Sequence, residues 1–189
     1  MAANDRNNPI RQPSSESDYS LIEFMRTYPD DAACLDALWR ERFAPDGHTA
    51  DCPRCEKPRR FHRTRTRASY TCDSCGLHIH PMKGTIFQKS TTSLHLWFYA
   101  MYLIASTRCG ISAKQLEREL GVTYKTAHRM FKQIRKLMGD DGDEPLSGDV
   151  EIDETSVRGR YLDEFAWRYN ARHEPGAMFS QLLSRAAGS

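Results

Sequence analysis

The stretch CPRCEKPRRFHRTRTRASYTCDSC, residues 52–75, contains two CxxC pairs, Cys52 with Cys55 and Cys72 with Cys75. A CxxC turn brings two thiolates to one side of a tight loop, where each can reach a metal ion at about 2.3 Å. Two such turns joined by a hairpin supply the four tetrahedral ligands of a structural zinc site. A redox pair or a chance coincidence is the alternative, but the paired spacing favours zinc. Because four thiolates complete the tetrahedron, we predict a closed, structural Zn²⁺ site and not a catalytic one.

Arginine alternates with threonine between the two cysteine pairs, at Arg63, Arg65 and Arg67. Period-2 alternation predicts a strand that carries the three guanidinium groups on one face, roughly 7 Å apart. This spacing suits the phosphates of a nucleic-acid backbone, although an exposed hairpin without a ligand would show the same pattern. We therefore expect the three arginines to contact DNA, and residues 77–80 to form the closing strand of the hairpin.

The formal net charge of the 189-residue chain is only +2, but the charges are unevenly distributed. Residues 52–137 contain 17 Lys/Arg and 4 Asp/Glu, a balance of +13, whereas residues 1–51 and 138–189 are both acidic. A concentrated basic block is typical of a nucleic-acid-binding centre, and a solvated basic face is the alternative. The charge distribution therefore favours a nucleic acid as a partner, and together with the motifs described here and below we expect this partner to be double-stranded DNA.

The second half of this basic block predicts three helices. Residues 94–106 are apolar on nearly all sides, as in a buried helix. Ser112 begins a capping box, S-x-x-Q, and Gly121 marks the turn that follows this helix. Thr123 can then cap a third helix over residues 124–138. The helix lengths and the turn are typical of a helix-turn-helix, although a plain helical hairpin with a polar face is common.

The last helix of this predicted helix-turn-helix would insert its N-terminal residues into the major groove. Its basic side continues toward the C-terminus, where lysines and arginines would lie near phosphates. The residues predicted to contact DNA are Thr123, Tyr124, Lys125, Thr126, Arg129, Lys132, Arg135 and Lys136.

Carboxylates alternate with apolar residues in GDVEIDET, residues 148–155. This pattern predicts a strand with its carboxylates on one face. A carboxylate such as Asp153 could hold Mg²⁺ for phosphoryl transfer, but two-metal chemistry needs further carboxylates from other elements. On the local pattern alone, a solvated acidic edge strand is the simpler interpretation.

The order of these motifs resembles that of the zinc-ribbon insertion-sequence transposases. The resemblance covers about residues 20–160 and rests on collinear motifs: CPRC and CDSC, then GTIF, LWFYAMYL, GISAKQLERELGVTYKTAHRMFKQIR and VEIDET. It implies an RNase H-like nuclease domain in which Asp153 is the first catalytic carboxylate, and Mg²⁺-dependent cleavage and joining of DNA strands. It also implies that the ribbon and the helix-turn-helix recognise the terminal inverted repeats of the element.

The chain departs from this family after Asp153, which only 36 residues follow. An RNase H-like domain needs on the order of 100 residues or more. Residues 161–172 resemble the family's C-terminal helix, so we expect the middle of the nuclease domain to be missing by internal deletion, and Asp153 to be inactive alone. The aromatic face of residues 161–169, together with Val150 and Ile152, is then expected to be disordered, to dimerise or to pack on the helical part.

We therefore predict an α+β protein of small modules: N-terminal helices, a four-cysteine zinc ribbon, a helix-turn-helix, and a truncated RNase H-like remnant formed by a strand and a C-terminal helix. Cys34, in the N-terminal helices, is expected to be a small core residue. The predicted boundaries are a disordered tail at 1–18, a helical segment at 19–47, the zinc ribbon at 48–89, the helix-turn-helix region at 90–138, an acidic linker at 139–149 and the catalytic-domain remnant at 150–189.

Three functions are compatible with the sequence. The first is a DNA-binding protein that lacks strand transfer and competes with full-length transposase for the terminal repeats. The second is a residual Mg²⁺-dependent nuclease, alone or completed in a homo-oligomer, and the third is a non-functional remnant. The longest apolar run, residues 94–105, is too short for a membrane span of roughly 20 residues. With no secretory signal at the N-terminus, we expect a cytoplasmic protein, associated with the nucleoid in a bacterium.

Overall fold

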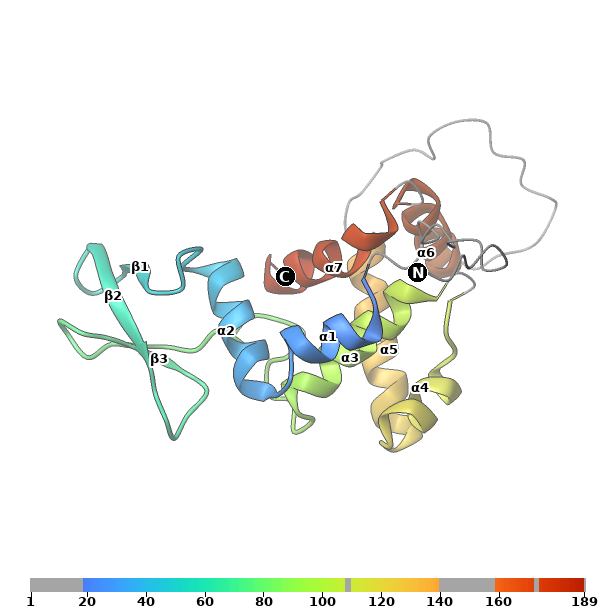
Figure 1. Ribbon diagram of the computed structural model, residues 1–189, viewed down its shortest axis with the longest axis horizontal. Coiled ribbons are helices and arrows are strands. Elements are labelled where there is room, and N and C mark those ends of the chain that lie inside the picture. Colours follow the sequence, from blue (N-terminus) through green and yellow to red (C-terminus); the bar gives the residue numbers. More distant parts are fainter. Residues whose placement is uncertain (1–18, 108–109, 140–158, 172–173, 189) are drawn as a thin grey trace, which may run out of the picture.

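The computed structural model describes residues 19–107, 110–139, 159–171 and 174–188. A small antiparallel sheet lies at one end of the molecule and a group of helices at the other, with α2 between them (Figure 1). This is the mixed α+β architecture that the sequence predicts. The strands are β1 (Thr49–Cys52), β2 (Lys57–Arg63), β3 (Tyr70–Cys72) and β4 (His78–Ile79). The helices are α1 (Leu21–Thr27), α2 (Asp31–Arg42), α3 (Leu94–Ser106), α4 (Ala113–Leu120), α5 (Tyr124–Gly139), α6 (Gly159–Asn170) and α7 (Met178–Gly188), the last preceded by a 3-10 turn, Pro175–Ala177.

The sheet is an antiparallel meander with the strand order β1-β2-β3-β4. Cys52 of β1 is paired with Lys57 of β2, and Phe61 of β2 with Cys72 of β3. Because successive strands reverse direction, the turn after β1 and the turn after β3 lie at the same end of the sheet. The two cysteine pairs occupy these two turns. The predicted closing strand at residues 77–80 is confirmed in part, as the shorter β4.

β2 ends at Arg63, so the prediction of one strand continuing over residues 64–67 is wrong. The chain turns instead at Thr64, whose N–H donates to the Ser69 carbonyl at 2.9 Å. The Thr64 hydroxyl also accepts from the buried Ser69 hydroxyl at 3.3 Å and lies 3.0 Å from the hydroxyl of Thr71. These side-chain hydrogen bonds close a loop, and a period-2 pattern of polar residues does not reveal them.

The first two helices begin at capping residues. The Ser20 hydroxyl accepts from the Glu23 N–H at 3.3 Å, while the Glu23 carboxylate accepts from the Ser20 N–H at 2.7 Å. Asp30 caps α2 by accepting from the Ala33 N–H at 2.8 Å. Such caps satisfy N–H groups that have no partner within the helix. Cys34, one turn later, is fully buried, which confirms its predicted place in the core.

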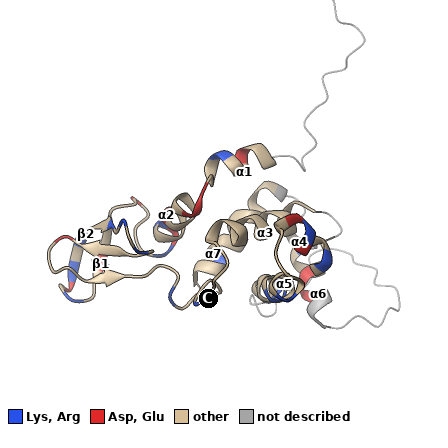
Figure 2. Ribbon diagram, turned by 90° about the horizontal axis from the view of Figure 1, so that it is seen from below, with Lys and Arg blue, Asp and Glu red and all other residues tan. Residues whose placement is uncertain are grey.

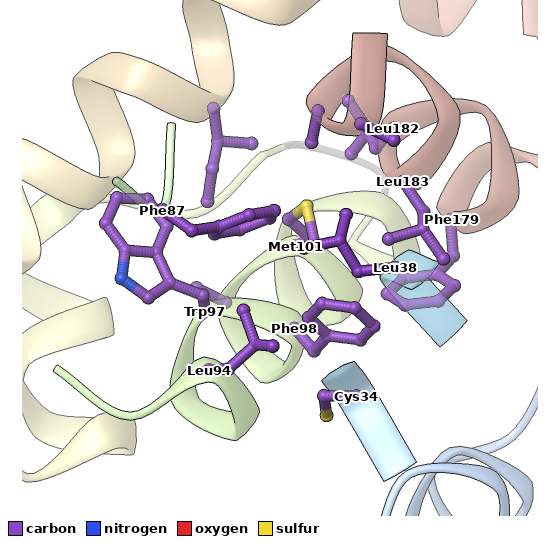
Figure 3. Packing of buried hydrophobic residues seen from close by; sticks show 14 of the residues in the cluster. Cys34, Leu38, Phe87, Leu94, Trp97, Phe98, Met101, Phe179, Leu182 and Leu183 are labelled. Atoms are coloured by element: carbon purple, nitrogen blue, oxygen red, sulfur yellow. The ribbon is translucent and has the colours of Figure 1, made fainter. Parts of the chain in front are cut away.

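The core of the helical part surrounds α3. In Figure 3, Leu38 of α2, Met101 of α3 and Leu183 of α7 lie close together, and all three are buried. The ring of Phe179 on α7 lies 5.7 Å from that of Phe24 on α1, in an edge-to-face arrangement. The core thus joins helices from both ends of the chain. Among the described helices, α3 included, none is long and apolar enough to cross a membrane.

α4 and α5 form the predicted pair of helices joined by a tight turn. The Ser112 hydroxyl caps α4 by accepting from the Gln115 N–H at 3.1 Å. Gly121 ends α4 in the left-handed conformation, with φ at 62°, which glycine adopts without strain. The Thr123 hydroxyl then accepts from the Thr126 N–H at 3.4 Å and begins α5. The caps and the turn that the sequence predicts here are confirmed.

The C-terminal helices are built into the helical part, since α6 packs on α5 and α7 on α3. Arg168 of α6 donates to the carbonyl oxygens of Ile104 and Thr107, each at 2.6 Å, at the C-terminal end of α3. Arg185 of α7 donates to the Leu137 carbonyl at 3.0 Å, at the C-terminal end of α5. The last carbonyls of a helix have no partner within it, so each arginine caps another helix.

The aromatic face predicted at residues 161–169 packs on the helical part in one place. Trp167 is buried, whereas the half-exposed Phe165 ring stacks on that of Tyr169 within α6, at 6.1 Å. Packing through Trp167 agrees with one of the three predicted outcomes, and dimerisation stays a prediction. The predicted tail at residues 1–18, the acidic linker after Gly139, and the predicted strand with Val150, Ile152 and Asp153 lie outside the described residues.

The cap that Arg185 provides can be tested by mutation. Arg185→Ala is expected to lower the free energy of unfolding by about 1.5–3 kcal/mol, because it removes a charged donor from the last carbonyls of α5. Urea unfolding measures this change. Arg26→Ala, at an exposed position in the last turn of α1, is the control and should cost less than about 0.5 kcal/mol. Equal effects of the two substitutions would show that Arg185 does not hold α7 against α5.

Candidate functional site

The four cysteines predicted as zinc ligands come together in the sheet. The Sγ atoms of Cys52, Cys55, Cys72 and Cys75 all lie within 4.8 Å of one another. Cys52 and Cys72 are buried, whereas Cys55 and Cys75 are partly exposed. The structure therefore assembles all four predicted ligands at one point, from two turns that are far apart in the sequence.

Both cysteine pairs lie in turns of the same kind. The Glu56 N–H donates to the Cys52 carbonyl at 2.8 Å, and the Gly76 N–H donates to the Cys72 carbonyl at 3.1 Å. Glu56 and Gly76 occupy equivalent positions and both have left-handed backbones, with φ at 52° and 69°. The chain thus reverses directly after the second cysteine of each pair, which keeps the two thiols of a pair on one side.

Hydrogen bonds within the cluster shift the pKa values of Cys52 and Cys55 in opposite directions. Burial raises the pKa of Cys52, but the backbone N–H groups of Cys55 and Arg54 and the Cys75 thiol, 3.5 Å away, lower that pKa overall, to about 7. Contact with the Cys75 thiol, together with burial, raises the pKa of Cys55 to about 12. Four thiolates cannot share this space without a cation, and four sulfur donors are typical ligands of Zn²⁺. The cluster can therefore bind a zinc ion.

The three arginines predicted to contact DNA from the ribbon have different surroundings. Arg63, at the end of β2, donates to the Ala32 carbonyl of α2 at 3.1 Å and lies 3.7 Å from the Asp36 carboxylate. Arg65 and Arg67 are exposed in the loop that follows. Arg63 thus connects the sheet to α2, whereas the other two side chains are open to solvent.

Four of the residues predicted to contact DNA form one exposed basic row along α5. Lys125, Arg129, Lys132 and Lys136 are all exposed, and their spacing of four, three and four residues places them on one side of the helix. We call this set the α5 basic row. Other basic positions lie on the sheet and on α4 (Figure 2). The row is opposite the buried face that includes Met130.

The N-terminal end of α5 is also open to solvent. Thr123 and Tyr124 are exposed, and Thr126 is partly exposed. The Tyr124 ring lies 5.8 Å from the ring of His128, which is exposed one turn further along. Sequence reasoning missed His128 because a neutral histidine adds nothing to a charge count. Its spacing of four residues from Tyr124 would have indicated that the two side chains are neighbours on the surface of the helix.

Arg135 lies on a different side of α5 from the basic row. Its Nε atom is 2.6 Å from the Glu164 carboxylate of α6, and its guanidinium lies 4.9 Å from the centre of the Phe131 ring. Only 8% of its side chain is exposed. Arg135 therefore connects α5 to α6, a role that helical periodicity could not reveal because Glu164 is distant in the sequence.

Within the described residues, no cluster of carboxylates suited to a metal ion is found. Asp153, implied as a catalytic carboxylate by family resemblance, lies outside them. On α6, Asp163 is exposed, whereas Glu164 is held between Arg135 and Arg168 at 2.6 and 3.0 Å. The Glu164 carboxylate thus forms ion pairs with two arginines and is not placed as a metal ligand.

Comparison with known proteins gives a similarity to a protein of a transposable element. The chain is 33% identical over 120 residues to an uncharacterised protein in transposable element ISH50 of Halobacterium salinarum. The match covers 60% of this chain but only 40% of the relative, so the chain spans less than half the length of the protein it matches. No protein-family model matches the chain, and no solved structure matches it. The chain is thus similar, over most of its length, to part of a protein encoded in a transposable element.

Proposed function

We propose that this protein binds double-stranded DNA and recognises the terminal inverted repeats of an insertion sequence. The observation that carries the proposal is the α5 basic row: four exposed cations on one side of a helix of 16 residues, about 24 Å long. A row of cations along one helix side suits the phosphates that flank a DNA groove. The similarity to a protein in a transposable element supports an insertion sequence as the source of the DNA.

In this proposal α4 and α5 act as a helix-turn-helix. The left-handed Gly121 and the Thr123 cap set a sharp turn between the two helices. The exposed Tyr124 and Arg129 would then reach base edges in the major groove, while Lys132 and Lys136 lie near phosphates. Leu116 and Leu120 of α4 are buried and support α5 from behind.

The four-cysteine sheet is the second DNA-binding part in this proposal. Zinc would be structural there, because four thiolates fill a tetrahedron and leave no position open for a substrate. The exposed Arg65 and Arg67 would add sequence-independent contacts to phosphates.

We further propose that the protein binds DNA without strand transfer. Asp153 alone is not a two-metal site. On α6, Glu164 is paired with two arginines, and α6 and α7 serve the packing of the helical part. Such a protein would compete with full-length transposase for the terminal repeats and, in this way, repress transposition.

The test uses the purified, zinc-loaded chain and labelled duplexes from the ends of the related transposable element. Binding is measured at physiological salt against a scrambled competitor, and Mg²⁺ is then added to detect strand breaks. We expect preference for the element ends and no cleavage. Equal affinity for the scrambled duplex would overturn the proposed recognition. Cleavage that disappears in Asp153→Ala would overturn the absence of catalysis. If a full-length transposase kept its activity when this protein was added in excess, the proposed competition would be overturned.

Two arginine-to-alanine substitutions should separate base reading from phosphate contact. Arg129→Ala should weaken binding to the element ends by about 1–3 kcal/mol and reduce the preference over scrambled DNA, because it removes a side chain that reads bases. Arg65→Ala should weaken binding to both duplexes equally. It should also make the slope of log K against log salt less steep by about 1, because one phosphate contact is lost. Titrations of both duplexes at several salt concentrations measure these effects. Indistinguishable behaviour of the two variants would contradict this division of roles.

A further inference from the structure

A small pocket lies where α2 meets the four-cysteine sheet. Its volume is about 200 Å³. One wall is formed by α2, through Asp36 and Arg40, which are one turn apart and share a side of the helix. Residues 61–63 at the end of β2 also line the pocket, as do Gly47 and His48 of the loop before β1. The pocket thus lies between three separate segments of the chain, with one arginine from α2 and one from β2.

The floor of this pocket is rigid and aromatic. The Trp39 and Tyr70 rings stack with centroids 4.2 Å apart and planes inclined by 7°, and the Phe61 ring lies 5.3 Å from that of Trp39. The Tyr70 hydroxyl donates to the Asp36 carboxylate. Burial, together with this hydrogen bond, raises the pKa of Tyr70, so the hydroxyl keeps its proton. The stacked rings and this hydrogen bond therefore connect α2 to the sheet below the pocket.

The loop before β1 is held in one conformation beside Arg40. The Asp46 carboxylate accepts from the backbone N–H groups of His48 and Thr49, at 2.9 and 2.8 Å. The Thr49 and His48 hydrogen bonds lower the pKa of Asp46 to about 2, so the carboxylate stays ionised at neutral pH. Gly47 has φ at +82°, and a Cβ atom on it would lie 3.1 Å from Nε of Arg40. A glycine at this position therefore leaves room for the guanidinium of Arg40 against the loop.

The charges that line the pocket are not balanced. Arg63 is partly neutralised by Asp36, 3.7 Å away. For Arg40, in contrast, no carboxylate of the described residues lies within the 4 Å of an ion pair, and its side chain is exposed. Among the charged residues that line the pocket, two guanidinium groups and one carboxylate leave an excess positive charge. Arginine forks are the groups that recognise phosphate oxygens.

We propose that this pocket binds one phosphate group of the DNA backbone, with Arg40 as its main ligand and Arg63 as the second. This inference rests on the proposed DNA binding and adds a contact site outside α5 and the 64–69 loop. A phosphate bound here would touch α2 and β2 at once. DNA would then fix the orientation of the sheet relative to the helices, and so set the distance between the two DNA-binding parts.

The first test compares Arg40→Ala with Arg26→Ala in the zinc-loaded full chain, using a labelled duplex at four salt concentrations. We expect Arg40→Ala to weaken binding about tenfold at 150 mM salt and to lower the slope of log K against log salt by about 1, equally for element-end and scrambled DNA. Arg26→Ala, an exposed arginine on α1, should leave both values unchanged. Asp36→Asn keeps an acceptor for the Tyr70 hydroxyl but removes the negative charge, so it should strengthen binding.

The second measurement is an NMR titration of the same proteins with inorganic phosphate. In the wild type we expect saturable shifts of the Nε–H signals of Arg40 and Arg63, with the Arg63 shift lost in Arg40→Ala. DNA binding that is unchanged in Arg40→Ala would overturn the pocket and leave the proposed function standing. Absence of DNA binding together with phosphate shifts would overturn the proposed function and reduce the pocket to a site for free phosphate. No phosphate shifts and an unchanged salt slope would overturn the inference outright.

Discussion

Chelation of zinc from the purified protein is expected to unfold the four-cysteine sheet and leave the helical part folded. Apart from its cysteines, the sheet buries little: Ala50, Phe61 and Tyr70 are its main buried side chains. A segment with so small a core depends on its metal, and zinc binding supplies about 10–16 kcal/mol of apparent free energy in small zinc domains. The helical part has its own core around α3 and does not need the metal.

Backbone amide NMR measures both halves of this expectation. After chelation, signals of residues 49–79 should collapse to positions of unfolded chain, while those of α3 and α5 stay dispersed. Cys72→Ser should reproduce the effect and abolish zinc uptake. Cys34→Ser is the matched control, because Cys34 is buried outside the cluster, and it should still bind one zinc ion per chain. A chelated protein with an intact sheet and unchanged DNA affinity would contradict the structural role of zinc.

Glu164→Ala is expected to lower the stability of the helical part by about 3–5 kcal/mol. The Glu164 carboxylate lies 2.6 Å from Nε of Arg135 and 3.0 Å from Nη2 of Arg168, and 8–13% of each of the three side chains is exposed. Removing one partner of a buried ion pair leaves an uncompensated buried charge, at a cost of about 3–5 kcal/mol. Here two arginines would lose their shared carboxylate at once, and Arg168 also caps α3.

Urea unfolding followed by helical circular dichroism measures this loss. Glu119→Ala makes the same substitution at an exposed position of α4, and it should change the free energy of unfolding by less than about 0.5 kcal/mol. If Glu164→Ala were as stable as this control, the ion pairs of Glu164 with Arg135 and Arg168 would not hold α6 against α5 and α3. The packing of the C-terminal helices would then need another explanation.

Features of the fold that depend on neighbouring residues could be predicted from the sequence. The CxxC pairs predict the cysteine cluster because each turn is local, and two such turns need only a hairpin to meet. Ser112, Gly121 and Thr123 predict the ends of α4 and α5 because caps and left-handed turns depend on residue type.

Features that depend on distant partners could not be predicted. Arg63 alternates with its neighbours like a strand residue, yet its hydrogen-bond partner Ala32 lies 31 positions away in α2. Arg135 is adjacent in sequence to Lys136 of the basic row and is grouped with it in the sequence prediction, but it forms a buried ion pair with Glu164 of α6. Arg168 caps a carbonyl 64 residues earlier. Periodicity shows which side of an element a residue lies on, and only the tertiary structure shows what lies opposite.

The pocket beside Arg40 is a further case of this kind. Arg40 lies in the acidic N-terminal part of the chain, so a charge count by segment assigns it to a region that repels DNA. The fold places it beside β2, next to Arg63. The electrostatic surface that DNA would meet therefore differs from the division of charge along the sequence.

The measurement that tests the central claim most directly is the fluorescence anisotropy of a labelled duplex over a series of salt concentrations. The zinc-loaded wild type is compared with a variant in which Lys125, Arg129, Lys132 and Lys136 are all replaced by alanine. We expect saturable binding by the wild type, with a slope of log K against log salt of about −4 or steeper. In the variant the slope should be less steep, by about 3–4. A wild type that fails to bind at 50 mM salt, or a variant that binds equally well, would contradict the claim that α5 binds DNA.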